Sequence, residues 1–219
     1  MKGFWENVLM PYLPASFLFG PAFYINSDLQ RRFAIGGGAG MLVRAEAYRA
    51  AGGHEALRGS VIDDIHLAIR VKRAGGRCRM VMADDFVRLR MYRGFREIVD
   101  GFSKNVAYVF EGAIGTFLAL STLFSLFAWT LPALVLIAAA AGAPLVPRDV
   151  ALAVVAFGVT VAARVGMAIY LRYPLWSALT QPLMAAVWAG IALRSLAWRF
   201  LHRQVRWRGR AYDASGAGF

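Results

Sequence analysis

Charged side chains are nearly absent from residues 112–198 of this 219-residue chain. A helix that faces water needs a polar stripe along one side, so this stretch does not fit an ordinary soluble domain. A bilayer about 30 Å thick requires roughly 20 apolar residues per spanning helix, and the stretch holds several such lengths. We therefore expect a membrane-embedded back half. Its only charged residues are Arg148, Asp149, Arg164, Arg172 and Arg194.

Cysteine and histidine are also scarce. The single cysteine, Cys78, excludes an intramolecular disulfide and a metal cluster held by cysteines alone. The three histidines, His54, His66 and His202, show no metal-ligand spacing with one another. We therefore predict no metal site within this chain.

The N-terminus lacks the pattern of a secretory signal peptide. Residues 8–25 are apolar, but Glu6 precedes them and Pro11, Pro14 and Pro21 interrupt them. Prolines inside an apolar run disfavour both the apolar core of a signal peptide and a spanning helix. We predict that this segment is a loop, either buried or in contact with the membrane.

The charged residues gather in two places. Residues 1–111 hold 16 of the 25 lysines and arginines and 11 of the 13 acidic residues, which is an ordinary soluble mixture. The second place is a basic tail, residues 199–219, in which arginines alternate with aromatic residues. Such a patch can bind nucleic acid, but directly after an apolar span it more often marks the cytoplasmic, anionic-lipid side of a membrane. We expect membrane lipids, and no nucleic acid, as partners.

Local patterns in the first half indicate an α/β unit. A glycine cluster at Gly36–Gly40 leads into a short strand, and a short helix at 45–51 ends at Gly52–Gly53. Strands are expected at 77–82 and 86–92, where apolar and basic residues alternate in the second.

Asp63 opens the next helix, predicted at Asp64–Ala74. The spacing of its residues predicts a buried face and a polar side. The buried face is Ile65, Ala68, Ile69 and Val71, and the polar side is Arg70, Lys72 and Arg73.

An amphipathic helix at 93–111 is expected to lie in the membrane interface and to lead into the apolar region. That region divides into blocks at 112–142, 150–171 and 175–198. Because the first block is long and contains Pro132, it is either a kinked span or a tight re-entrant hairpin.

Topology is left open by this pattern. Three crossings place the basic tail opposite the charged half, against the positive-inside rule, whereas an even number places both on the cytoplasmic side. We expect a cytoplasmic tail. Arg164 lies in the middle of its block, where a charge is costly, so it should face protein, water or a lipid headgroup.

Asp63 and Asp64 are the best candidates for chemistry. Two carboxylates at a helix start are stabilised as anions by the unpaired N–H groups there. An ionised, partly exposed aspartate can act as a general base toward a hydroxyl, although the same pattern also suits a helix cap followed by a first-turn acid.

The glycine cluster and His54 are weaker candidates. Gly37, Gly38 and Gly40 would let the backbone approach a ligand, but no Gly-Lys-Ser/Thr follows, so the cluster is not a phosphate-binding loop. A tight turn is the simpler interpretation. His54 would bind a substrate hydroxyl or phosphate, or is simply solvated.

The order of these segments resembles a known family. Residues 37–54, Gly-Gly-Ala-Gly-Met-Leu-Val-Arg-Ala-Glu-Ala-Tyr-Arg-Ala-Ala-Gly-Gly-His, look like the second half of a family 2 glycosyltransferase catalytic domain. Residues 63–76, Asp-Asp-Ile-His-Leu-Ala-Ile-Arg-Val-Lys-Arg-Ala-Gly-Gly, resemble the acid-Asp segment of that family. Residues 90–92 and 101–105, the spans and the closing segment 205–212 are similar to its lipid-modifying branch, which includes ceramide glucosyltransferase-like, hopanoid-associated and carotenoid-ester glycosyltransferases.

The resemblance implies a fold and a reaction. Residues 1–92 would be the C-terminal half of a GT-A-type α/β domain, followed by the interfacial helix at 93–111, transmembrane helices at 112–198 and the tail at 199–219. The intact enzyme would transfer a sugar from a nucleotide-sugar to a lipid at the cytoplasmic face of the inner membrane. Asp64 would be the catalytic base, and the substrate-binding residues would be Gly37, Gly38, Gly40, Asp63, His54 and Lys104.

Two departures from the family pattern qualify this picture. The Gln-x-x-Arg-Trp motif of processive polysaccharide synthases is missing from 98–102, which argues against chain elongation. No nucleotide-binding aspartate strand and no Asp-x-Asp motif precede Gly36, and the adjacent Asp84 and Asp85 do not replace them. The ligands for the expected Mg²⁺ or Mn²⁺ are therefore not in this chain, and a partner chain would have to carry the N-terminal half.

Two further functions stay open. We expect the chain alone to be inactive, and it would be a non-catalytic membrane-anchoring subunit or a truncated product lacking the nucleotide-binding half. Alternatively, it would be a membrane module for lipid or polysaccharide export.

Overall fold

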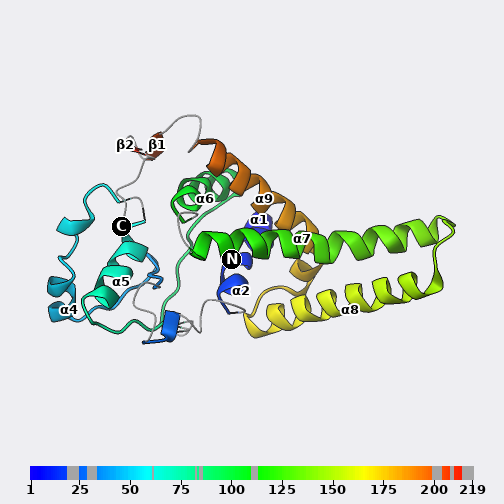
Figure 1. Ribbon diagram of the computed structural model, residues 1–219, viewed down its shortest axis with the longest axis horizontal. Coiled ribbons are helices and arrows are strands. Elements are labelled where there is room, and N and C mark those ends of the chain that lie inside the picture. The colour runs from blue at the N-terminus through cyan, green and yellow to red at the C-terminus, as the bar shows by residue number, and fades with distance from the viewer. Residues whose placement is uncertain are drawn as a thin grey trace.

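A computed structural model describes residues 1–18, 25–28, 34–60, 62–81, 83, 86–109, 113–198, 204–207 and 210–213. These residues are mostly helical (Figure 1). The helices in chain order are α1 (Phe4–Leu9), α2 (Tyr12–Leu18), α4 (Ala45–Ala50), η1 (Glu55–Leu57), α5 (Asp63–Arg73), α6 (Phe95–Val109), α7 (Ala113–Ala140), α8 (Pro147–Tyr170), η2 (Leu175–Thr180) and α9 (Gln181–Ala197).

Part of the basic tail forms an antiparallel ribbon of β1 (Gln204–Trp207) and β2 (Arg210–Asp213), in which Gln204 lies opposite Asp213. Among the tail's arginines, Arg199, Arg203 and Arg208 lie outside the described residues.

The three apolar blocks form helices, as predicted. Within the described residues, three segments are long and apolar enough to cross a membrane: Thr122–Ala140, Pro147–Tyr170 and Leu175–Ala197. The chain therefore carries a helical membrane region. The first block is one continuous helix of 28 residues with Pro132 inside it, so it is not the re-entrant hairpin that the sequence also allowed.

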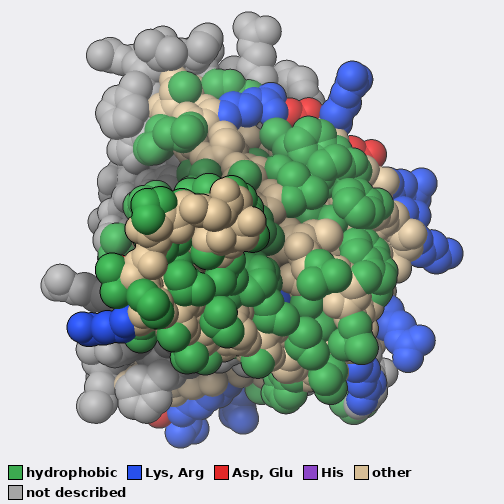
Figure 2. Space-filling model, turned by 90° about the vertical axis from the view of Figure 1, so that its right-hand side faces the viewer, with side chains coloured by type: hydrophobic (Ala, Val, Ile, Leu, Met, Phe, Trp, Pro, Cys, Tyr) green, Lys and Arg blue, Asp and Glu red, His purple; other side chains and the backbone are tan. Residues whose placement is uncertain are grey.

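The outer part of the α7–α8 hairpin, with its tip, projects away from the remaining helices (Figure 1). Its outer side chains are apolar and exposed: Phe124 is 75% exposed, Ile137 65% and Val159 63%. Seen toward the tip of the hairpin, apolar side chains dominate the face, and lysines and arginines stand at its edges (Figure 2). Exposed apolar surface of this extent is unfavourable in water and suits a lipid environment.

The N-terminal segment differs from the expected loop. It forms α1 and α2, and the side chains of Val8, Leu9 and Tyr12 are at most 3% exposed. Pro14 lies in the first turn of α2, where its missing N–H would have had no partner within the helix. Pro14 is therefore compatible with the first turn of α2. Residues 19–24 lie outside the described part of the chain.

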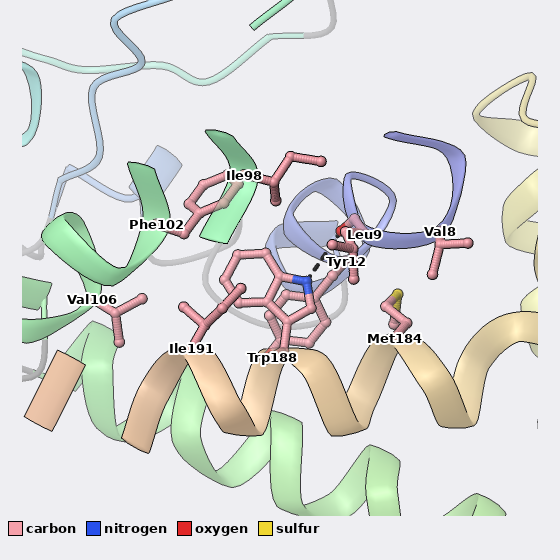
Figure 3. Packing of buried hydrophobic residues seen from close by; sticks show 9 residues of the cluster. All are labelled: Val8, Leu9, Tyr12, Ile98, Phe102, Val106, Met184, Trp188 and Ile191. Carbon is pink, nitrogen blue, oxygen red and sulfur yellow. Dashed lines mark hydrogen bonds between the residues drawn. The ribbon is translucent and has the colours of Figure 1, made fainter. Parts of the chain in front are cut away.

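Trp188 lies at the centre of the largest buried cluster (Figure 3). Its ring contacts Tyr12 and Phe102 at centroid distances of 4.6 and 4.7 Å, and its indole N–H donates to the Leu9 carbonyl at 3.1 Å. A second link joins α9 to α6, because the Ser195 hydroxyl donates to the Ser103 carbonyl. The cluster joins α1, α2, α6 and α9, and its members are Val8, Leu9, Tyr12, Ile98, Phe102, Val106, Met184, Trp188 and Ile191.

The amphipathic helix is confirmed as α6, and part of its apolar stripe faces this cluster. Ile98, Phe102 and Val106 are buried, whereas Phe95 is 38% exposed. The cause is α9, which supplies an apolar partner for the stripe within the protein itself.

Helix α5 also forms as predicted, but its buried face differs. Leu67, Ala68 and Val71 are buried, whereas Ile65 and Ile69 are only partly covered. Lys72, expected on the polar side, is 2% exposed. The reason is that its ammonium group donates to the Ile25 and Ser27 carbonyls at 2.7 and 2.9 Å, which fixes residues 25–28 against α5. Burial lowers the pKa of this lysine.

The strands expected after the glycine cluster and at 77–82 and 86–92 are not assigned in the described residues. Asn26 instead brackets the Met80 backbone, accepting from its N–H at 2.7 Å and donating to its carbonyl at 3.4 Å. A strand exists only with a neighbour to pair with. The described residues of this region therefore form no α/β sheet.

Glu6 ties α1 to the segment that leads into α6. Its carboxylate is 2% exposed and accepts from Arg90 at 2.5 and 3.1 Å and from the N–H groups of Lys2 and Gly3 at 3.2 Å. The hydrogen bond from Arg90 lowers the pKa of Glu6 from its ordinary 4.5 to about 2, although burial acts in the opposite direction.

We predict that the chain stays in the membrane pellet after a high-salt or alkaline carbonate wash, because the apolar helices hold it there. Each arginine near an anionic surface adds only about 1 kcal/mol. A variant without residues 199–219 should therefore pellet as the full chain does. Release of most of the protein by carbonate would show that the helices do not span the bilayer.

Glu6→Gln should lower the thermal unfolding temperature in detergent at pH 7 and flatten its decline below pH 4.5. A carboxylate whose folded pKa lies near 2 stabilises the fold above its unfolded pKa near 4.5, and that contribution is lost as the pH falls from 4.5 toward 2. Hydrogen bonds to charged groups contribute about 1.5–3 kcal/mol.

The control is Glu55→Gln, because Glu55 and its partner Arg58 have side chains that are both 83% exposed. An exposed pair contributes little, so this variant should match the wild-type protein across the pH range. Equal effects of the two substitutions would contradict the assigned role of Glu6.

Candidate active site

The two aspartates lie in the first turn of α5. The residue before the helix, Ile62, has no side-chain cap. Instead, the two carboxylates accept hydrogen bonds from amides of the first turn. Asp63 accepts from the N–H of Asp64 at 3.1 Å, and Asp64 accepts from the N–H of Ile65 at 2.8 Å. Asp63 was expected to be the residue that caps the helix; in the structure it is the first helical residue, and both acids share the capping role. Negative charge is favoured at this helix end.

The glycine cluster folds against this helix start. The second carboxylate oxygen of Asp64 accepts the N–H of Gly38 at 2.7 Å. The cluster itself forms a turn, because Gly40 donates its N–H to the Gly37 carbonyl at 3.0 Å. The structure therefore brings Asp64 together with the glycines that the sequence singled out, across 26 residues of chain.

Gly36 is required by close contact, a role that sequence reasoning did not assign to it. A Cβ atom at this position would lie 2.2 Å from the Asp64 carbonyl oxygen, far inside van der Waals contact. A Cβ at Gly38 would lie 3.3 Å from the Asp64 carboxylate, whereas Gly37 has open space around it. The signal available in the sequence was the run of glycines itself, which does not say which of them meets another part of the chain.

Asp64 keeps capacity for chemistry in this arrangement. An ionised carboxylate offers about four lone-pair directions, and the two described amide donors occupy two of them. The side chain is partly exposed, and Gly37, Gly38 and Gly40 beside it are exposed. A substrate hydroxyl therefore has room to approach the carboxylate and transfer a proton to it.

His54 and Lys104 are placed elsewhere. His54 follows Gly52 and Gly53, whose positive φ angles of 83° and 57° turn the chain after α4. The Tyr48 hydroxyl bonds His54 Nδ1 at 2.7 Å and accepts the His54 N–H at 2.9 Å. Lys104 lies on α6, which packs against α1, α7 and α9. Among the described interactions, none joins His54 to Asp64.

Groups of three or more histidine, cysteine, aspartate or glutamate residues suited to a metal ion do not occur in the described part of the chain. Asp84, Asp85 and His202 lie outside it. The described residues therefore provide no donor set for a divalent cation. No protein-family model, curated protein or solved structure matches this chain.

Gly36→Ala should destabilise the protein by about 1–3 kcal/mol, the usual cost of overpacking, because the new methyl group would overlap the Asp64 carbonyl. Gly37→Ala is the matched control and should stay within about 0.5 kcal/mol of the wild-type protein. Thermal unfolding in detergent measures both. Equal costs for the two variants would mean that the glycine turn does not pack on α5 as described.

Proposed function

We propose that this chain is the C-terminal part of a membrane-bound, inverting glycosyltransferase of family 2, acting on a lipid at the cytoplasmic face of the inner membrane. The observation that carries the proposal is the Asp64 carboxylate, held at the start of α5 by the Gly38 N–H at 2.7 Å and still open to solvent. The apolar helices α7, α8 and α9 on the same chain support a lipid acceptor.

In the proposed mechanism, Asp64 takes the proton of the acceptor hydroxyl as that oxygen bonds to the anomeric carbon of the sugar. The bond from that carbon to the nucleoside diphosphate breaks on the opposite face, so the configuration inverts and the electron pair leaves with the diphosphate. Gly37, Gly38 and Gly40 leave the space beside the carboxylate for the reacting groups. Lys104 would contact the lipid side of the acceptor from α6, and His54 a hydroxyl or phosphate of the donor.

Binding of the nucleotide-sugar donor would require residues other than those that the structure describes. Mg²⁺ or Mn²⁺ would supply positive charge to the departing diphosphate, and the described residues provide no ligand set for it. We propose that a partner chain carrying the other half of the GT-A domain supplies this site and the nucleotide-sugar contacts.

Exposed apolar residues support such a partner. Leu42 is 103% exposed, Phe86 92% and Leu89 54%, and they lie in segments that the sequence predicts to be strands. Extended segments with open apolar side chains are suited to pair with additional strands. Pairing with the partner's sheet would complete the α/β domain and cover these side chains.

The deciding experiment compares membranes from cells that express the wild-type chain, Asp64→Asn or Asp63→Asn. Transfer of labelled sugar from UDP-glucose, the probe, to extractable lipid is measured with and without the candidate partner half. Loss of a general base reduces turnover about 10²–10⁴-fold. Losing a helix-capping carboxylate costs only about 1 kcal/mol of stability, so Asp63→Asn should be mild.

Asparagine retains only one acceptor oxygen, so Asp64→Asn also gives up one of the two amide contacts. Thermal unfolding of the same variants separates that structural loss from the catalytic one. Turnover above about a tenth of wild type in Asp64→Asn, well short of general-base loss, would place the base elsewhere. Transfer equal to that of membranes lacking the chain, even with the partner half, would favour a non-catalytic anchoring subunit.

A further inference from the structure

Arg164 on α8 is a buried charge without a hydrogen-bond partner in the described part of the chain. The residue is 7% exposed, although it lies within a membrane-spanning helix. Its Nε atom and both terminal nitrogens have no hydrogen-bond partner among the described residues. A buried, uncompensated charge costs several kcal/mol, and such residues inside membrane proteins are characteristically functional. An anionic group that is not part of the described chain would offset this cost.

The antiparallel hairpin defines the level of Arg164 in the bundle. Trp129 of α7 and Phe157 of α8 are in edge-to-face contact at 5.4 Å. Arg164 is seven residues beyond Phe157 (164 − 157), and Thr122 is seven residues before Trp129 (129 − 122). Because the two helices run in opposite directions, Arg164 lies at the level of Thr122.

Buried polar groups of other elements gather near this level. The Thr122 hydroxyl bonds the Tyr12 hydroxyl at 2.5 Å, and Gln181 donates its side-chain N–H to Ser125, one turn further along α7, at 2.5 Å. Within the described residues, the Ser177 hydroxyl and the Gln181 side-chain carbonyl are buried without partners. We call these residues the polar layer: Tyr12, Thr122, Ser125, Arg164, Ser177 and Gln181.

The packing of α8 connects Arg164 to this layer. Helix α8 packs mainly against α7 and η2, and the described buried residues on its C-terminal half are Arg164, Met167 and Ala168. These two neighbours carry Thr122, Ser125 and Ser177, and η2 leads directly into Gln181. A guanidinium that donates, a hydroxyl that donates and a carbonyl that accepts are thus buried on contacting elements.

The depth of Arg164 favours a lipid headgroup as the occupant. It lies six residues before Tyr170, the last residue of α8, which is about 9 Å at 1.5 Å per residue. This end of α8 packs on η2, which leads into α9, and the hairpin tip is at the other end (Figure 1). The outer faces of α7 and α8 are apolar and exposed, so the neighbouring medium is lipid.

We propose that Arg164 and the polar layer bind the phosphate group of an anionic membrane lipid in the leaflet nearest the charged half of the chain. A guanidinium matches phosphate with two parallel hydrogen bonds, and the Ser177 hydroxyl adds a donor. The Gln181 carbonyl accepts a headgroup hydroxyl, which phosphatidylglycerol carries. The proposal does not rest on glycosyl transfer.

The test uses the purified full chain in detergent micelles with phosphatidylcholine, titrated with phosphatidylglycerol. Native mass spectrometry measures bound lipid, and thermal unfolding measures the stabilisation that binding produces. Arg164→Met should weaken phosphatidylglycerol binding at least about tenfold, because it removes the charged donor. Without anionic lipid, the same variant should be at least as stable as the wild-type protein, since it removes an unpaired buried charge.

The matched control is Arg148→Met, an exposed arginine at the other end of the same helix, which should bind phosphatidylglycerol as the wild-type protein does. Arg164→Lys keeps the charge but not the two-pronged donor, so its affinity should fall between the other two. It also keeps the test valid if the methionine variant fails to fold.

Three outcomes would overturn the proposal. The first is unchanged phosphatidylglycerol binding in Arg164→Met. The second is equal stabilisation of the wild-type protein by inorganic phosphate, which would assign the site to a free anion. The third is stabilisation that depends on protein concentration rather than on lipid, which would indicate a carboxylate from a second copy.

Discussion

Packing around Trp188 connects the two ends of this chain and sets the position of most other elements. Its indole N–H reaches the carbonyl of Leu9, 179 residues earlier in sequence, while its ring lies between Tyr12 and Phe102. Helix α9 is therefore an apolar span and, at the same time, the surface on which α1, α2 and α6 are assembled. In its span 39% of the residues are buried within the protein, against 6% in the span on α7, so the two helices face different surroundings.

The Trp188 cluster also helps to position segments in the charged half, residues 1–111. Helix α1, held by Trp188, presents Glu6 to Arg90, and that ion pair fixes the segment that enters α6. Residues 25–28 are held separately, by Lys72 of α5 and by an ion pair between Asp28 and Arg79 that lowers the pKa of Asp28. Charged groups that meet backbone carbonyls and carboxylates thus connect these segments, between which the described residues form no strand pairs.

Asp64 and Arg164 are opposite cases of the same electrostatic problem. The carboxylate of Asp64 lies at a helix start, where unpaired N–H groups and the Gly38 amide stabilise its charge, and part of it still reaches solvent. The guanidinium of Arg164 lies inside the helical hairpin region with no compensating group among the described residues. Proton transfer suits the first arrangement, because the two amide contacts hold the carboxylate in place while part of it stays accessible. Anion binding suits the second, because a bound anion would offset a charge that meets no partner among the described residues.

The membrane helices, α5 and α6 were predictable because each depends on a local pattern. A long run without charges specifies a helix in lipid whatever its neighbours are, and a periodic apolar stripe specifies an amphipathic helix. The Asp64 candidate followed from its place at a helix start. Helices α1 and α2 were not predictable, because Pro11 and Pro14 argue against a helix locally, whereas the contacts with α6 and α9 arise only in the tertiary structure. The strands predicted around Leu42 and Phe86 are not assigned in the described residues. Alternation of apolar and polar residues is a local signal, but a strand also requires pairing with a second segment.

The sequence by itself determined where the chain enters an apolar environment and that Asp63 and Asp64 lie near a helix start, since both depend on neighbouring residues alone. Tertiary structure decided which groups meet across long separations. It buried Lys72 because two carbonyls from residues 25–28 reach its ammonium group. It also left no room for a side chain at Gly36, because the Asp64 carbonyl oxygen lies where a Cβ atom would be. It also placed Arg164 at the level of Thr122, since the direction in which one helix packs on another depends on the loop and contacts between them and not on either sequence pattern.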